Sequence, residues 1–219
     1  MPKKPKTASL TYEKKHLELG HTRIIGIDEA GRGAWAGPVY AGAVGLPYDS
    51  RDLTELLSGV RDSKEMSPRQ RESLIETIQS VALVWGVGSA SSQEIDEFGI
   101  IGATKLAMRR ALLQTMEGGF KPDVLLLDAM RWDTAPVNAI QESIIKGDRH
   151  SLSIAAASVL AKVYRDAYMR QLDQQYPDYV FSKHKGYGTK THQQALTAHG
   201  ITPEHRHCFR PIQEMSKLI

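Results

Sequence analysis

The chain contains one cysteine, few aromatic residues and no long apolar run, and each of these shortages excludes a class of protein. With Cys208 as its only cysteine, it cannot form an internal disulfide, so a disulfide-stapled secreted scaffold is excluded. No stretch approaches the ~20 consecutive apolar residues that a membrane helix needs. The basic start MPKKPKTASL lacks the apolar segment of a signal peptide. We therefore expect a cytoplasmic protein with no membrane partner.

The remaining composition is that of a folded domain. Hydrophobic residues make up 41% of the 219 residues and charged residues 24%, which excludes a disordered chain. No repeat of ~20–50 residues is visible, so a solenoid or propeller is not expected. The length suits one domain with a buried core and leaves room for a small appended segment.

Charge is spread unevenly along the chain. The formal net charge is only +3, yet the first six residues are basic, and so is the segment 181–210. The basic residues of that segment are Lys183, Lys185, Lys190, Arg206 and Arg210, against Glu204 as the acid. A basic segment on an acidic body indicates a polyanionic partner. A solvated surface is the alternative, and we favour it for the short N-terminal tail.

Apolar patterning predicts five strands. Two β-rich runs follow each other across a glycine-rich turn, and three more alternate with helical segments. The predicted strands are 23–30, 39–46, 81–89, 124–128 and, from a weaker pattern, 137–145. Helices are predicted at 67–80, at 92–116 with a break near Gly99, and at 151–175. This order favours a mixed sheet covered by helices on both faces.

Four carboxylates lie where predicted strands and loops end. Asp28 and Glu29 close the first strand, Asp128 closes the strand 124–128, and Asp148 precedes the long helix. Because parallel strands share one carboxyl edge, we expect Asp128 to lie near Asp28. Neighbouring strand residues point to opposite faces, so Asp28 and Glu29 serve one site only if the strand ends or bulges there.

Carboxylates that converge repel one another and raise one another's pKa, so such a cluster calls for divalent cations. Ligand sets made only of oxygen suit Mg²⁺ or Mn²⁺. Two such ions form a clamp for in-line attack on a phosphodiester. The alternative treats these acids as ordinary surface groups, with Asp148 as a residue that favours a helix start.

Six motifs in a fixed order resemble ribonuclease HII, a type 2 ribonuclease H. They are DEAGRG with GPV at 28–39, DSK at 62–64, LD at 127–128, KGD at 146–148, IAAASVLAKVYRD at 154–166 and HKGYGT at 184–189. Each motif alone is weak, but the six together span about residues 23–211. The chain departs from the family pattern at 34–35, 65–66 and 129–130, where no carboxylate of the set is lost.

The resemblance implies an α/β fold: a ribonuclease H-like core with a five-stranded mixed sheet, flanking helices and a C-terminal helical extension. On this basis we divide the chain into three parts. Residues 1–20 form a basic N-terminal tail and lead-in, and residues 21–177 form the ribonuclease H-like catalytic core. Residues 178–219 form a helical, substrate-binding extension that packs on the core, since no linker separates it.

The resemblance also implies an activity. It points to an endonuclease that hydrolyses the RNA strand of RNA–DNA hybrids and cuts 5′ of single ribonucleotides in duplex DNA. The products carry 5′-phosphate and 3′-hydroxyl ends, and the chemistry uses two metal ions, Mg²⁺ or Mn²⁺. Metal binding and catalysis are assigned to Asp28, Glu29, Asp128 and Asp148.

The resemblance further assigns residues to substrate binding. Gly31, Arg32 and Gly33 are expected to read the ribose 2′-hydroxyl, with Tyr187 against the next deoxyribose and Lys64 on a phosphate. The 2′-hydroxyl distinguishes RNA from DNA, and glycine allows the backbone to approach it. A ring packed on deoxyribose would clash with an added hydroxyl.

Ser158 and Lys162 share one face of the long helix, four residues apart. They either approach the nucleic acid or support the core, and the sequence favours the second role. A zinc site at His205, His207 and Cys208 lacks the usual ligand spacing and is not expected.

Two other functions stay open. A non-catalytic nucleic-acid-binding module on the same fold would gain nothing from gathering acids near phosphates. A glycosidase needs two carboxylates and a sugar groove, for which 7% aromatic residues is modest. No motif identifies a protein partner and no feature indicates an oligomer, so we expect a monomer.

Overall fold

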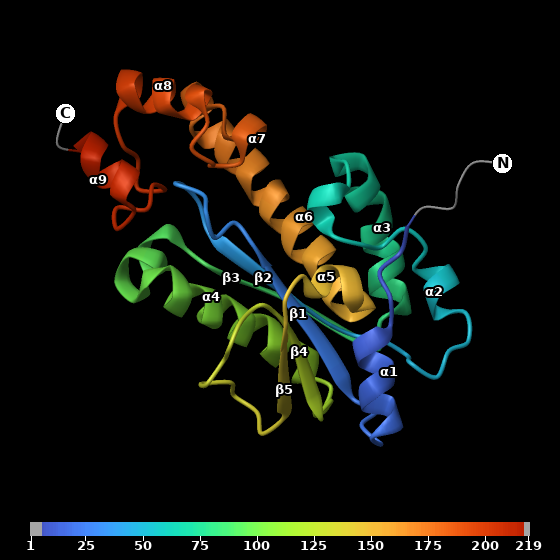
Figure 1. Ribbon diagram of the computed structural model, residues 1–219. Helices are drawn as coiled ribbons and strands as arrows, with labels where there is room; N and C mark the ends of the chain where they lie inside the picture. The colour runs from blue at the N-terminus through green and yellow to red at the C-terminus, as the bar shows by residue number, and fades with distance from the viewer. Residues whose placement is uncertain (1–5, 217–219) are drawn as a thin grey trace.

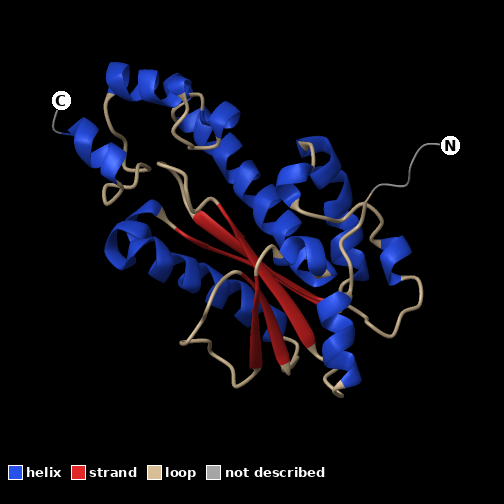
Figure 2. Cartoon of the chain, viewed as in Figure 1, coloured by secondary structure: helices blue, strands red, loops and turns tan. Residues whose placement is uncertain are grey.

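The computed structural model describes residues 6–216 and contains a mixed sheet in the strand order β3-β2-β1-β4-β5 (Figures 1 and 2). The strands are β1 (Ile24–Ala30), β2 (Val39–Gly45), β3 (Val84–Ala90), β4 (Val124–Asp128) and β5 (Ile140–Ile144). Strands β1, β2 and β3 form an antiparallel meander, whereas β4 and β5 run parallel to β1. The predicted fold class, a five-stranded mixed sheet with flanking helices, is confirmed.

The helices occupy the segments between and after the strands. They are α1 (Thr11–Glu18), α2 (Leu53–Leu56), η1 (Ser63–Glu65), α3 (Pro68–Val81), α4 (Ser92–Met116), α5 (Gly147–His150), α6 (Leu152–Gln175), η2 (Pro177–Tyr179), α7 (Phe181–His184), α8 (Lys190–His199) and α9 (Arg210–Ser216). Among these helices, α3 and α4 each begin with a capping box, in which a serine and the side chain three residues later satisfy each other's backbone amides.

The local predictions hold with small shifts at the element boundaries. The predicted break in the second helix is confirmed, because Gly99 interrupts α4 with a φ of +68°. The third strand was expected from residue 81 but begins at Val84, because α3 continues through Val81. The basic N-terminal tail falls largely on residues 1–5, which lie outside the described residues, as do residues 217–219 of the expected extension.

Two long helices cover the sheet from opposite sides (Figure 1). Helix α4 packs on one face, where Ile25 and Ile27 of β1 and Leu125 and Leu127 of β4 are buried. Helix α6 packs on the other face, where the intervening residues, such as Ile24, join the core. This alternation follows from the two-residue repeat of a strand and explains the uninterrupted apolar runs of β1 and β4.

Helix α6 lies unusually close to the sheet because two strand positions lack side chains. A Cβ atom on Gly26 would collide with the backbone of Ser153 and Ile154, and one on Gly42 would collide with the carbonyl of Ala157. Because Gly42 pairs with Asp28, this close approach places the second turn of α6, at Ala157, beside the carboxyl end of β1.

The C-terminal segment after α6 packs on the end of α6 and on the loop after β1. Tyr179, Phe181 and Leu196 form a small apolar core together with the end of α6. A β-bridge between Ala36 and His205 joins this segment to the glycine-rich loop after β1. Among residues 6–216, no helix combines the length and the apolar character that crossing a bilayer requires.

The close contact between α6 and the sheet gives a stability prediction. Gly42→Ala should lower the free energy of unfolding by about 1–3 kcal/mol, because its methyl group would push α6 away from β2. Gly118→Ala is the matched control, since nothing lies within 4 Å of a Cβ there. Urea unfolding of both variants measures the difference. Equal stability of the two variants would contradict this account of the packing.

Candidate active site

Three carboxylates converge where β1 and β4 end. Asp28 on β1, Asp128 at the end of β4 and Asp148 on α5 each offer an oxygen, and these oxygens lie within 4.8 Å of one another. The parallel register pairs Ile27 with Leu127, so the next residue on each strand, Asp28 and Asp128, comes to the same edge. The expected meeting of these two acids therefore follows from strand direction and register.

Hydrogen bonds fix two of the carboxylates. Asp28 is 3% exposed, and its Oδ1 accepts the amide of Glu29 at 2.7 Å. The Oδ1 of Asp128 accepts the amide of Gly147 at 2.7 Å. Because Gly147 directly precedes Asp148, this bond ties the start of α5 to the end of β4. The third carboxylate is thus placed through the second.

The carboxylates disfavour one another's charge. Burial, followed by the charges of Glu29 and Asp128, raises the pKa of Asp28 well above its ordinary value. Burial, followed by repulsion from Asp62 and Asp128, raises the pKa of Asp148 to about 6. A divalent cation among them would relieve this repulsion. The donors are all carboxylate oxygens, the ligands that Mg²⁺ and Mn²⁺ prefer, so the set fits such an ion.

Glu29 lies beside this group of three and outside it. Strand β1 continues without a bulge to Ala30, which pairs with Tyr40, so the distortion that the sequence required for a shared site is absent from β1. Glu29 nevertheless interacts with Asp28, because its charge is the second cause, after burial, of the raised pKa of Asp28. The Oε1 of Glu29 accepts a hydrogen bond from Arg32 Nη1 at 3.2 Å. Burial raises the pKa of Glu29, the Arg32 guanidinium opposes this, and the charge of Asp128 adds to it.

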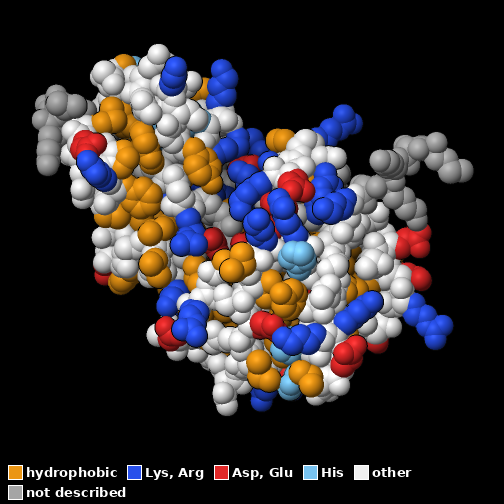
Figure 3. Space-filling view, viewed as in Figure 1, with side chains coloured by type: hydrophobic (Ala, Val, Ile, Leu, Met, Phe, Trp, Pro, Cys, Tyr) orange, Lys and Arg blue, Asp and Glu red, His pale blue; other side chains and the backbone are white. Residues whose placement is uncertain are grey.

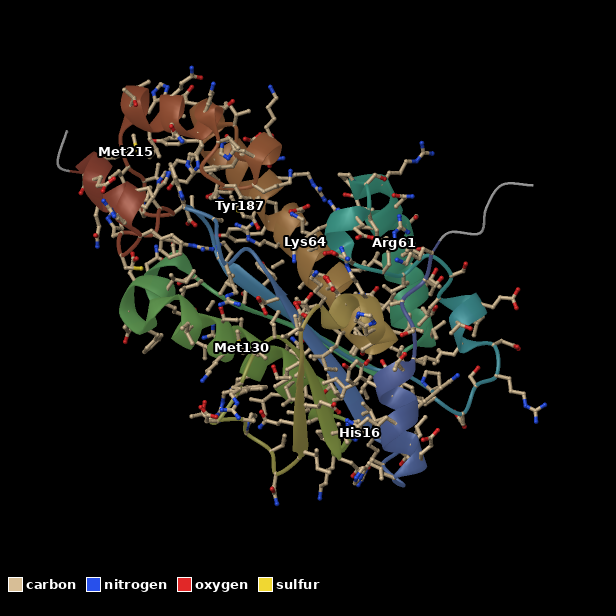
Figure 4. All side chains as sticks on the ribbon, viewed as in Figure 1. His16, Arg61, Lys64, Met130, Tyr187 and Met215 are labelled. Carbon is tan, nitrogen blue, oxygen red and sulfur yellow. The ribbon has the colours of Figure 1, made fainter. Side chains whose placement is uncertain are left out.

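A cleft of about 190 Å³ adjoins the carboxylates and holds all five residues that the sequence assigned to substrate binding. Its lining is Glu29, Ala30, Gly31, Arg32, Gly33, Ser63, Lys64, Lys162 and Tyr187. Figure 4 labels Lys64, which comes from η1, and Tyr187, which follows α7. Burial alone would lower the pKa of Lys64, but the surrounding aspartates, Asp28 first among them, raise it.

Three further residues belong to the site's surroundings. Ser158, which the sequence interprets as core support, donates to Ser63 Oγ at 2.9 Å and opposes the rise in the pKa of Asp28 that burial causes. Lys162 lines the cleft while its Nζ pairs with Asp166 Oδ1 at 2.6 Å. Asp62 repels Asp148 and caps η1 by accepting the amide of Lys64 at 2.9 Å. In the sequence, the four-residue spacing of Ser158 and Lys162 on one helix face was the pattern that could indicate their place near the site.

Basic side chains gather on the face of the molecule where the cleft opens. Figure 3 shows a dense group of Lys and Arg side chains near the centre of this view, interspersed with few acids. Not every basic residue of the 181–210 segment joins such a surface. Arg206, which the charge pattern counted toward a polyanion surface, is fully buried.

A chain of buried histidines holds the backbone of Tyr187. The amide of Thr202 donates to His205 Nδ1 at 3.0 Å, which leaves His205 Nε2 to donate to His192 Nε2 at 3.0 Å. His192 Nδ1 then donates to the carbonyl of Tyr187 at 3.1 Å. This chain requires both rings to be neutral. It also engages both ring nitrogens of His205 in hydrogen bonds within the protein.

Comparison with known proteins places these residues in a family. The family model described as Ribonuclease HII matches residues 25–212. The chain is 50% identical over 204 residues to Ribonuclease HII of Roseiflexus castenholzii, covering 93% of this chain and 89% of that protein.

Solved structures share the fold. The ribonuclease H2 of Pyrococcus horikoshii OT3 matches with a TM-score of 0.69 and 23% identity, over 90% of this chain and 98% of that one. Bst-RNase HIII in complex with Mn²⁺ matches with a TM-score of 0.67 and 18% identity, over 92% of this chain and 71% of that one.

The repulsion among the carboxylates predicts a response to divalent ions. Mg²⁺ or Mn²⁺ at ~100 times its dissociation constant should add about 2.7 kcal/mol to the free energy of unfolding. Asp128→Asn should remove most of this gain while leaving the metal-free protein at least as stable, because it removes a repelling charge. Thermal melts with and without each ion measure both effects. A full metal response in Asp128→Asn would exclude Asp128 as a ligand.

The histidine chain predicts a loss of stability in acid. Burial, together with nearby histidines, lowers the pKa of His192 to about 4 and that of His205 to about 3 from an ordinary value of 6.5. As the pH falls below 6.5, the unfolded chain binds protons that the folded chain refuses, so the free energy of unfolding falls.

Urea unfolding at a series of pH values below 6.5 measures how steeply the free energy of unfolding falls with pH. His205→Gln should flatten it, whereas His199→Gln, at an exposed position of the same segment, should leave it unchanged. An identical slope in wild type and His205→Gln would show that this ring does not contribute.

Proposed function

The chain belongs to the ribonuclease HII family and is an endoribonuclease that acts on RNA–DNA hybrids, and from this premise we propose that it also cuts duplex DNA 5′ of a single embedded ribonucleotide. In the proposed reaction, water attacks the phosphorus on the 5′ side of the ribonucleotide. The bond from phosphorus to the preceding 3′ oxygen breaks, leaving 3′-hydroxyl and 5′-phosphate ends.

One observation carries this proposal: three converging carboxylates lie beside a cleft lined by Gly31, Arg32, Gly33 and Tyr187. Carboxylates supply the chemistry of phosphodiester hydrolysis, and the cleft supplies the place where the sugar is recognised. Neither part alone accounts for a nuclease that chooses its cutting site by one hydroxyl group.

We assign metal binding and catalysis to Asp28, Glu29, Asp128 and Asp148. Two divalent ions, Mg²⁺ or Mn²⁺, would supply Lewis acids that lower the pKa of the attacking water and stabilise the leaving oxygen. The chain itself fixes the positions of two carboxylates, because the amides of Glu29 and Gly147 donate to Asp28 and Asp128. Glu29 contributes from the rim of the cleft, where its partner is Arg32.

Recognition of the ribonucleotide is assigned to the cleft wall. The amides of Arg32 and Gly33 take part in no hydrogen bond among the described residues, so they are free to meet a 2′-hydroxyl. Tyr187 is 38% exposed, and its ring can cover the sugar of the next nucleotide. Lys64 supplies a charge for a phosphate, and the C-terminal extension takes part in substrate binding by carrying Tyr187.

Bst-RNase HIII, which shares the fold, has been crystallised with Mn²⁺, and this supports the choice of a hard divalent ion. The alternative of a non-catalytic binding module is not favoured. Buried carboxylates that repel one another weaken phosphate binding unless an ion joins them, so a module that only binds would do better without them.

The proposal is tested with a labelled DNA duplex that contains one ribonucleotide, compared with the same duplex made only of DNA. We expect a single cut 5′ of the ribonucleotide in Mg²⁺ or Mn²⁺ and none in EDTA. Asp128→Asn should slow the cut by about 10³-fold or more, on the scale of losing a main source of transition-state stabilisation.

Asp133→Asn is the matched control, because this aspartate is 85% exposed and lies outside the cleft and the carboxylate group. It should cut like wild type. Cleavage in EDTA would exclude the metal mechanism. Cleavage of a continuous RNA–DNA hybrid but not of the single ribonucleotide would exclude the proposed reading of a lone 2′-hydroxyl.

A further inference from the structure

A buried arginine from the C-terminal segment forms hydrogen bonds with the loop that follows β1. Arg206 is fully buried, and its guanidinium donates to three backbone carbonyls. Its Nη2 reaches Gly31 at 2.8 Å, its Nη1 reaches Arg32 at 2.9 Å and its Nε reaches Gly37 at 2.9 Å. These three hydrogen bonds tie the segment 31–37 to an arginine about 170 residues further along the chain.

A second buried arginine supports the same loop from α6. Arg165 Nε donates to the carbonyl of Pro38 at 2.9 Å, and its Nη2 donates to that of Ala36 at 3.3 Å. Among the described residues, every hydrogen bond from either guanidinium goes to a backbone carbonyl. Burying a guanidinium that is not paired with a carboxylate lowers the stability of the folded state. A contact that only fastened this loop to the core would not require two buried guanidiniums.

The hydrogen bonds from Arg206 determine the direction of the Arg32 and Gly33 amides. In a trans peptide unit the C=O and the N–H lie on opposite sides. The carbonyl of Gly31 shares its peptide unit with the amide of Arg32, and the carbonyl of Arg32 shares its unit with the amide of Gly33. Because Arg206 draws both carbonyls inward, both amides turn away from it.

These two amides face the cleft. Arg32 and Gly33 are exposed and line it, and neither amide has a hydrogen-bond partner among the described residues. Gly31 permits this arrangement in two ways. Its φ is +95°, which disfavours other residues, and a Cβ there would collide with the Arg165 side chain.

We propose that Arg206 is a positioning residue that sets the direction of the Arg32 and Gly33 amides and so determines how well the chain distinguishes a ribonucleotide from a deoxyribonucleotide. This inference rests on the proposed function, in which that loop reads the 2′-hydroxyl. Arg206 itself does not touch the nucleic acid.

The test measures discrimination separately from stability. Binding is measured in Ca²⁺, or in EDTA if Ca²⁺ supports cutting, for a duplex with one ribonucleotide and for the same duplex without it. The ratio of the two affinities is the readout, and thermal melting reports the fold. Arg206→Met should reduce this ratio by about tenfold, the scale of one good hydrogen bond, while affinity for the all-DNA duplex stays the same.

Arg206→Lys keeps the charge but cannot grip three carbonyls at once, and it serves if Arg206→Met does not fold. It should also lose discrimination, with kcat on the single ribonucleotide falling more than KM rises. Arg210→Ala, in an exposed ion pair of the same segment, should keep the wild-type ratio.

The outcomes separate the two proposals. A wild-type ratio of one would overturn both the reading of a lone 2′-hydroxyl and the role of Arg206. A wild-type ratio well above one that a folded Arg206→Lys or Arg206→Met retains would overturn the role of Arg206 alone. A variant that melts earlier but discriminates like wild type would have lost only a structural anchor.

Discussion

Negative charge is concentrated at one edge of the sheet, where Asp28, Asp128 and Asp148 face one another in surroundings that water reaches poorly. Repulsion within such a group lowers the stability of the fold, so contacts elsewhere in the structure must hold the carboxylates together. Here the parallel pairing of β1 with β4 and the hydrogen bond between Gly147 and Asp128 hold them together. A bound divalent ion turns this repulsion into affinity, so the group that strains the fold is the one suited to phosphodiester chemistry.

The C-terminal segment completes the opposite wall of the cleft. It carries Tyr187, whose carbonyl the histidine chain holds, and Arg206, which grips the loop after β1. Chemistry and recognition thus come from different parts of the chain. The sheet edge supplies the carboxylates, and the packing of the C-terminal segment on the loop shapes the surface that contacts the sugar.

The sequence predicts β1 to β4 well because each is an apolar run bounded by glycine, proline or a helix cap, whereas β5, with the sequence IQESI, is mostly exposed and gives only a weak pattern. Strand direction also brings Asp28 and Asp128 together. The place of Glu29 could not be decided, because it depends on β1 staying regular through Ala30. Arg206 was misread as a surface charge, since a basic residue in a basic segment gives no sign that backbone carbonyls surround it. Composition reports charge, whereas burial is a property of tertiary packing.

The central claim is that divalent ions held by these carboxylates contact the phosphate that is cut. The most direct test replaces a non-bridging oxygen of that phosphate with sulfur and compares cleavage in Mg²⁺ and Mn²⁺, for each of the two stereoisomers. Sulfur binds Mg²⁺ poorly and the softer Mn²⁺ better. The account predicts that at least one isomer is cut much more slowly in Mg²⁺ and is largely restored in Mn²⁺. An equal effect of sulfur in both ions, for both isomers, would contradict it.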